Sequence, residues 1–149
     1  MADAASVTLS ATVLPDEIAK TISGSMTVTP ADANDKWYYK LTAVSTASTD
    51  LMAGYFTDYT GVDDDTAPTA VHTADKVKFL FIKNTDSANP VYIKVDGDAA
   101  STSAAGSLYV PAGESMAIRI PNSTVADIHA IAGTSAVTCI VAALLDDVA

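Results

Sequence analysis

Cationic side chains are scarce in this sequence. Lysine and arginine together number 8, against 18 aspartate and glutamate residues, which gives a formal net charge of −10. Proteins that bind nucleic acid gain much of their affinity when cationic side chains neutralise phosphates. A chain with this charge is repelled by DNA, by RNA and by anionic membranes. We therefore expect neither a nucleic-acid partner nor a membrane partner.

Cysteine and histidine, the usual ligands of zinc, are also nearly absent. Cys139 is the only cysteine, so it can form neither an internal disulfide nor, alone, a zinc site. It lies in the apolar run Cys139–Leu145, where we expect a buried, inert thiol. The two histidines are His72 and His129. If the segment around His129 is a strand, Asp127 shares its face, and we favour an ordinary surface pair over a catalytic dyad.

Sequence motifs of catalysis are missing. The sequence contains no nucleophile elbow, phosphate-binding loop, dinucleotide-binding glycine pattern or zinc-protease helix motif. Paired carboxylates for glycoside hydrolysis stay open, because acids at any separation can meet, but solvated turns explain the acids better. We therefore predict no catalytic residues, no cofactor and no enzymatic activity. We also expect no secretory leader and no membrane helix, because no basic leader and no apolar run of about 20 residues occurs.

The acidic run Asp63–Asp65 is the best metal candidate in the sequence. Calcium prefers several hard oxygen ligands from a flexible loop, which makes Asp63, Asp64 and Asp65 candidate ligands. The run lacks the spacing and the glycine of an EF-hand. We therefore favour a solvated acidic loop and predict no metal site.

What the sequence does have is a repeated alternation of apolar and polar residues with a period of two. This alternation puts apolar side chains on one face of a β-strand and polar side chains on the other. Thr, Val, Ile and Tyr, which favour strands, dominate these stretches. The alternating stretches are 6–13, 21–29, 36–43, 91–96 and 115–120.

Two further stretches, Val77–Ile82 and Val137–Leu145, are apolar on both faces, which is typical of central strands or of strands against a partner. Short strands separated by turns and without intervening helices indicate an all-β, antiparallel β-sandwich, with a jelly roll as the preferred variety. We expect one domain over residues 1–149, in which 1–19 is an N-terminal arm or strand. The alternative is a domain boundary within 57–75.

Aromatic residues form two groups that are candidates for contact with a partner. The contiguous residues Trp37, Tyr38 and Tyr39 must point to both faces of their strand, so one face is left for an interface while the other joins the core. Tyrosine and tryptophan are enriched at protein interfaces. Tyr55, Phe56 and Tyr59 form the second group.

Several of these stretches resemble small structural proteins of tailed bacteriophages. The resemblance is carried by Lys36–Lys40, by the strand Lys76–Thr85 and by the strand Val91–Gly97 that follows it. It continues through the Pro-x-Gly-Glu turn in Tyr109–Ser115 and through Ile128–Leu145. It covers most of the chain beyond Lys20, whereas residues 1–19 match nothing in that family.

The resemblance implies a structural virion protein, and most of all a head decoration or cement protein that binds the outside of a phage capsid and stabilises it. The implied partners are the major capsid protein shell and copies of the chain itself, with a trimer as the expected oligomer. Synthesis in the host cytoplasm and a place on the capsid exterior follow. The segment Ala2–Leu14 is a candidate to add a strand to a neighbour. The alternative is a carbohydrate-binding or host-adsorption sandwich of a phage neck, tail or fibre.

Overall fold

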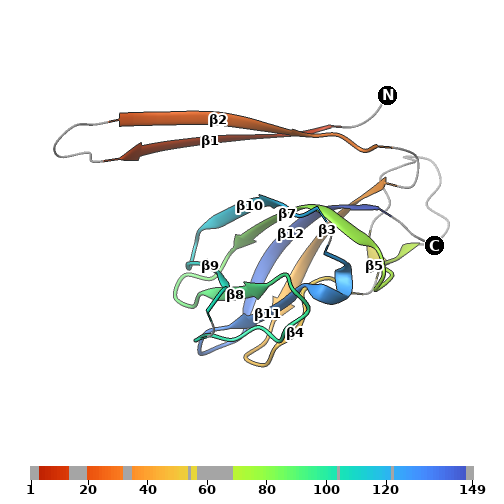
Figure 1. The fold of residues 1–149 in the computed structure, drawn as a ribbon. Helices are drawn as coiled ribbons and strands as arrows, with labels where there is room; N and C mark the ends of the chain where they lie inside the picture. Colours follow the sequence, from red (N-terminus) through yellow and green to blue (C-terminus); the bar gives the residue numbers. More distant parts are fainter. Residues whose placement is uncertain are drawn as a thin grey trace. The chain divides into compact units, whose positions relative to one another are not determined.

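The chain is an all-β protein in which every strand pairing is antiparallel. The computed structural model describes residues 4–13, 20–31, 35–53, 55–56, 69–103, 105–121 and 123–146. They divide into two compact units, Met1–Asp32 and Ala33–Ala149 (Figure 1). The alternating pattern by itself gives one domain with an arm or strand at 1–19, whereas the first unit extends to Asp32.

The first unit is a β-hairpin of two nine-residue strands, β1 (Ala5–Val13) and β2 (Lys20–Val28). The strands pair along their whole length, from Ala5 opposite Val28 to Val13 opposite Lys20. The segment that the sequence offers as a strand for a neighbour is therefore one half of a hairpin formed within the chain. The register puts apolar residues of both strands on one face and only serine and threonine on the other.

The second unit is a sandwich of two four-stranded sheets, which lie as two layers in Figure 1. The β12 sheet has the order β10-β7-β12-β3, and the β8 sheet has the order β4-β11-β8-β9. The strands of the β12 sheet are β10 (Ser115–Arg119), β7 (Lys76–Asn84), β12 (Val137–Asp146) and β3 (Asp35–Val44). Those of the β8 sheet are β4 (Thr49–Asp50), β11 (His129–Ala132), β8 (Val91–Lys94) and β9 (Leu108–Val110).

The remaining elements are short. The strands β5 (Tyr55–Phe56) and β6 (Thr69–Ala70) pair with each other, and a single 3-10 turn, η1 (Val125–Asp127), precedes β11. Among the described residues, no helix is long and apolar enough to cross a membrane. The sandwich predicted from the alternation is confirmed, while the jelly roll stays a prediction because these strand orders do not establish it.

The core of the sandwich lies between the two sheets. It contains the inward residues of β7 and β12 from one sheet and of β8 and β11 from the other, including Ile82, Val141, Ile93 and Ala130. Cys139 belongs to this core and its thiol is free and buried, as the sequence predicts. Burial raises the pKa of the Cys139 thiol to about 11, which keeps the thiol protonated and unreactive near neutral pH.

The two stretches that are apolar on both faces are the central strands of the β12 sheet, as expected. β7 and β12 lie side by side, flanked by β10 and β3. Their pairing contains a bulge, because Leu144 pairs with Phe79 and the next residue, Leu145, pairs with Val77. Lys78 is the extra residue, and a bulge of this kind redirects the side chain it carries.

The redirected Lys78 joins an ion pair across three strands. Its Nζ lies 2.8 Å from Oδ1 of Asp35 on β3 and 3.3 Å from Oδ2 of Asp146 on β12. The carboxylate of Asp35 is fully buried, so Lys78 compensates a charge that water does not reach. The hydrogen bond to Asp35 raises the pKa of Lys78, with burial opposing it.

The chain crosses from the β12 sheet to the β8 sheet through the loop after β7, and Asn84 holds this crossover. The Nδ2 of the fully buried Asn84 donates to the carbonyl oxygens of Asn89 at 2.8 Å and Pro111 at 3.2 Å. Its Oδ1 accepts the N–H of Asp86 at 3.0 Å. The turn at 84–90 and the turn at 111–113 are thus joined by one amide side chain.

Candidate functional site

The first group of predicted contact residues lies on β3, at one edge of the β12 sheet. Tyr38 is buried in the core, because alternate residues of a strand point to opposite faces, and it is therefore removed from the contact candidates. Trp37 and Tyr39 point to the outer face, where Tyr39 is 49% exposed. Trp37 packs edge-to-face on Phe79 with ring centroids 6.3 Å apart.

The second group is placed only in part. Tyr55 and Phe56 form β5, but the positions of their side chains are outside the described residues, as is all of Tyr59. The calcium candidates Asp63, Asp64 and Asp65 also lie outside the described residues. In the part of the chain that the structure describes, no group of three histidine, cysteine or acidic side chains could hold a metal ion.

The outer face of the β12 sheet carries apolar residues from three neighbouring strands, with Lys83 at one end. Cross-strand pairing places Tyr39, Ala142 and Phe81 in one row and Leu41, Ile140 and Lys83 in the next. Leu41 is 62% exposed at the β3 edge. This outer face, 37–43 of β3 with its partners on β12 and β7, is one candidate contact surface, and it contains Trp37 and Tyr39 from the predicted contact residues.

The apolar face of the hairpin is the second candidate contact surface. Leu9 is 52% exposed and Ile22 is 64% exposed, and they lie on the same face because Ala11 pairs with Ile22 and Leu9 with Gly24. The opposite face, which includes the pair Ser10 and Ser23, has no apolar residue in either strand. The hairpin is thus a ribbon with one wettable face and one apolar face.

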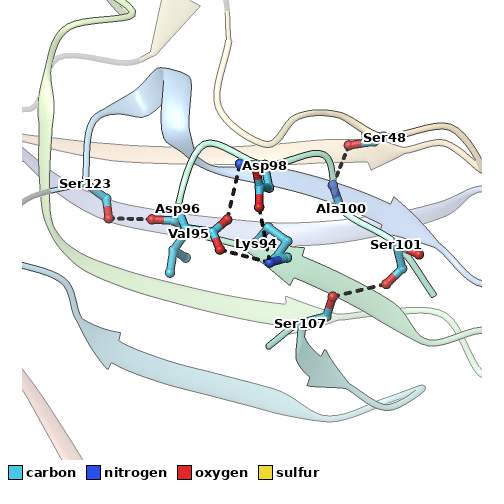
Figure 2. Close-up of polar contacts among 9 residues, drawn as sticks. All are labelled: Ser48, Lys94, Val95, Asp96, Asp98, Ala100, Ser101, Ser107 and Ser123. Atoms are coloured by element: carbon cyan, nitrogen blue, oxygen red, sulfur yellow. Dashed lines mark hydrogen bonds and ion pairs between the residues drawn. The ribbon is translucent and has the colours of Figure 1, made fainter. Parts of the chain in front are cut away.

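The outer face of the β8 sheet carries polar groups at the end where the 95–107 loop begins (Figure 2). Lys94, although charged, is largely buried, and its Nζ lies 2.9 Å from Oδ2 of Asp96 and 3.9 Å from Oδ2 of Asp98. The hydrogen bond from Lys94 lowers the pKa of Asp96 and raises the pKa of Lys94. These ion pairs fix the start of the loop to β8.

Hydrogen bonds to the backbone hold the rest of this loop. Oγ of Ser107 donates to the carbonyl oxygen of Ser101 at 3.1 Å, and Oγ of Ser48 accepts the N–H of Ala100 at 2.8 Å (Figure 2). Gly97 and Gly106 have positive φ angles of 85° and 82°, which glycine adopts without strain. The described residues of this loop are therefore held by hydrogen bonds at Ala100 and at Ser101.

His129 continues this polar row across the sheet. It pairs with Lys94 on β8 and with Asp50 on β4, and its Nε2 lies 3.3 Å from Oδ1 of Asp50. From its position in the sequence, Asp127 is the expected partner of His129. In the structure its carboxylate instead binds Thr124 at the start of η1. Asp127 Oδ2 accepts the N–H of Thr124 at 2.8 Å and its hydroxyl at 2.9 Å, bonds that lower the pKa of Asp127. The condition for a shared face, that Asp127 and His129 lie in one strand, is not met, because Asp127 is the last residue of η1 and the strand begins at His129.

A pair of tyrosines lies one row further along the same face. Tyr92 of β8 pairs with Tyr109 of β9 on one side and with Ile131 of β11 on the other. The two rings are 5.2 Å apart between centroids and tilted by 52°, and Tyr109 is 54% exposed. Neither tyrosine is among the contact residues predicted from the sequence. The sequence does contain a signal for them. Tyr92 and Tyr109 alternate with the buried residues Val91, Ile93 and Val110, which places both tyrosines on the opposite, outer face.

A small cleft opens where the edges β3 and β4 approach each other. Its volume is about 220 Å³, and Tyr38, Thr42 and Asp50 are among the residues that line it. Burial raises the pKa of Tyr38, with the neighbouring Thr42 and Ala53 opposing it, so its hydroxyl stays neutral near pH 7. The prediction that the chain is not an enzyme stays a prediction.

These features define an all-β sandwich with an appended two-faced hairpin, in which surfaces for contact are more prominent than any cleft. Comparison with family models, with curated proteins and with solved structures returns no match. The chemistry and exposure of the described residues are therefore the basis for a function.

Proposed function

We propose that this chain is a structural protein of a tailed-phage particle, a decoration protein that binds the outside of the head, and that the β1–β2 hairpin is its docking element. The observation that carries the proposal is the exposure of Leu9 and Ile22 on the apolar face of the hairpin, at the part of the hairpin away from the buried Val28. A two-stranded hairpin is at best marginally stable in water. A ribbon with one apolar face gains stability when a partner covers that face, as expected of an assembly element.

The size of the hairpin indicates what kind of binding it supports. Nine residues span about 30 Å and two strands about 10 Å, so one face offers roughly 300 Å². A standard stable interface buries about 800 Å² on each partner. The hairpin alone therefore supports weak binding of one copy. Many copies on one particle turn weak contacts into firm attachment, which is how a decoration protein functions.

The outer face of the β12 sheet supplies a second apolar surface to the same proposal. Tyr39 and Leu41 are exposed at its β3 edge. We assign this surface to contacts with the capsid shell or with neighbouring copies of the chain, with a trimer as the expected arrangement from the phage resemblance. Interfaces usually have aromatic and aliphatic residues at their centre and charged residues at their rim.

The charge of the chain favours the exterior of the particle over the interior. A protein of net charge −10 is repelled by packaged DNA. On the outside the same charge keeps the carboxylates in water, where they avoid the desolvation cost of a buried interface. The resemblance of 76–85, 91–97 and 109–115 to small phage structural proteins points to the same place.

The proposal is tested on purified tailed-phage particles from the organism that encodes the chain. An antibody raised against the recombinant chain is expected to label the outside of the heads in electron micrographs. Quantitative mass spectrometry of the same particles is expected to give a copy number of the order of that of the major shell protein. Particles that contain only traces of the chain, or label restricted to the tail, would contradict a head decoration protein.

A further inference from the structure

The outer face of the β8 sheet has an organisation that the docking function does not use. Tyr109, Tyr92 and Ile131 form a row across β9, β8 and β11. A second, parallel row contains Lys94, two residues after Tyr92 on β8, and His129, two residues before Ile131 on β11. Asp50 of β4 extends this row. Residues two apart in a strand lie on the same face about 7 Å apart. An aromatic row thus lies beside a row of charged and hydrogen-bonding groups.

The aromatic row is open to a ligand on one side. Tyr109 is 54% exposed and its ring is tilted by 52° against that of Tyr92, so the two rings form a shallow angled cradle. The ring faces carry partial negative charge, which favours contact with polarised C–H groups. The C–H face of a pyranose ring fits this description, because its hydroxyl groups lie at the rim of the ring.

The polar row supplies groups suited to the hydroxyl groups of a saccharide that extends from the tyrosines towards β4. The carboxylate of Asp50 is half exposed and holds His129 through one oxygen, at 3.3 Å, which leaves its other oxygen available to accept hydrogen bonds from hydroxyl groups. Nδ1 of His129 is buried and has no hydrogen-bond partner among the described residues. The ion pairs of Lys94 with Asp96 and Asp98 hold the polar border in place before any ligand arrives. Such preorganisation lowers the cost of binding.

We propose that the outer face of the β8 sheet binds neutral saccharides, with Tyr109 and Tyr92 stacking on one sugar ring and Asp50, on the opposite edge strand β4, accepting hydrogen bonds from hydroxyl groups of a neighbouring sugar unit. The aromatic row consists of two tyrosine rings and one isoleucine. Its area suits a sugar ring and is far smaller than the roughly 800 Å² that a stable protein interface buries on each partner. The net charge of −10 repels acidic polysaccharides, so the ligand class is neutral. This site is separate from the proposed docking through the hairpin.

The test is a titration of the ¹⁵N-labelled full chain with cellotriose and with chitotriose, followed by amide chemical shifts. A heparin tetrasaccharide is the anionic comparison. We expect one of the neutral trisaccharides to shift resonances of β8, β9 and β11, with a dissociation constant of about 1 mM, and heparin to shift none. Removal of a stacking ring typically weakens binding by roughly 5- to 100-fold. Tyr109→Ala is therefore expected to weaken saccharide binding by at least about 10-fold.

Two further variants separate the ring from its hydroxyl and from the polar row. Tyr109→Phe keeps the stacking face and is expected to stay within about 3-fold of the unmodified chain, whereas Asp50→Asn is expected to weaken binding by about 5-fold. Unchanged Trp37 fluorescence and an unchanged urea midpoint confirm that each variant is folded. No shift with either trisaccharide, shifts confined to other surfaces, or full binding by Tyr109→Ala would each overturn the proposal. If Tyr109→Ala weakens attachment to phage heads without any saccharide binding, the face is a protein interface and the saccharide site is wrong.

Discussion

Asn84 is the residue whose loss we expect to be most costly to the sandwich outside its apolar core. Its side chain is fully buried and makes three hydrogen bonds of 2.8, 3.0 and 3.2 Å, to Asn89, Asp86 and Pro111, and a fourth, longer one of 3.4 Å to the carbonyl oxygen of Val110. A buried hydrogen bond contributes about 1 kcal/mol net. Asn84→Ala is therefore expected to lower the free energy of unfolding by about 3 kcal/mol, which is a decrease of about 1.5 M in the urea midpoint for a slope of about 2 kcal/mol per M.

Urea unfolding followed by fluorescence measures this effect, because the only tryptophan, Trp37, lies in the β12 sheet of the same unit. Ser87→Ala, in the exposed part of the same loop, is the matched control and should change stability by less than about 0.5 kcal/mol. Asn84→Asp is expected to be at least as damaging as Asn84→Ala at pH 7, because a carboxylate cannot donate to the carbonyl groups of Asn89, Val110 and Pro111. A loss below about 1 kcal/mol for Asn84→Ala would refute the reasoning that this amide holds the crossover between the sheets.

Two further predictions concern buried ionisable groups. Cys139, whose pKa burial raises to about 11, is expected to leave a thiol reagent unreacted at pH 8 in the native protein and to react once per chain in urea; rapid native labelling would show that the core is open there. Lys78→Gln is expected to lower the unfolding free energy by about 1–3 kcal/mol, because it leaves the buried carboxylate of Asp35 without its cation, while the exposed Lys83→Gln changes it little. Since the pKa of Lys78 is raised, its contribution is complete below the ordinary value of 10.5 and is lost as pH rises through the folded value; a difference between wild type and Lys78→Gln that persists undiminished well above that range would contradict the pairing.

The sequence predicts which residues of a strand share a face far better than which strands are neighbours. The alternation over 6–13 and 21–29 gives the two faces of the hairpin within a residue of the observed bounds. The doubly apolar stretches 77–82 and 137–145 are the two central strands of the β12 sheet, where one apolar face of each strand joins the core and the other belongs to the outer face of the sheet. These inferences are local, because each depends only on the direction in which successive side chains point.

The pairings that build the candidate sites are not local. Asp35 and Lys78 meet only because β3 and β7 flank β12, and the bulge that redirects Lys78 has no signature in the residues around it. His129 appears in the sequence to belong with Asp127, yet strand order brings it to Asp50 instead. The tyrosine pair on the β8 sheet likewise depends on the pairing of β8 with β9. Predictions based on proximity along the chain fail where sheet topology decides the partner.

The central claim, that the apolar face of the hairpin docks the protein on a phage head, is tested most directly by binding to heads that lack the chain. Leu9 and Ile22 are each about half exposed, so covering both contributes about 2 kcal/mol, or roughly 30-fold in affinity. We predict that the double variant Leu9→Ser with Ile22→Ser loses about this factor in a co-sedimentation assay. The matched pair on the opposite face, Ser10→Ala with Ser23→Ala, should bind as the wild type does. Equal binding by all three proteins would contradict the account.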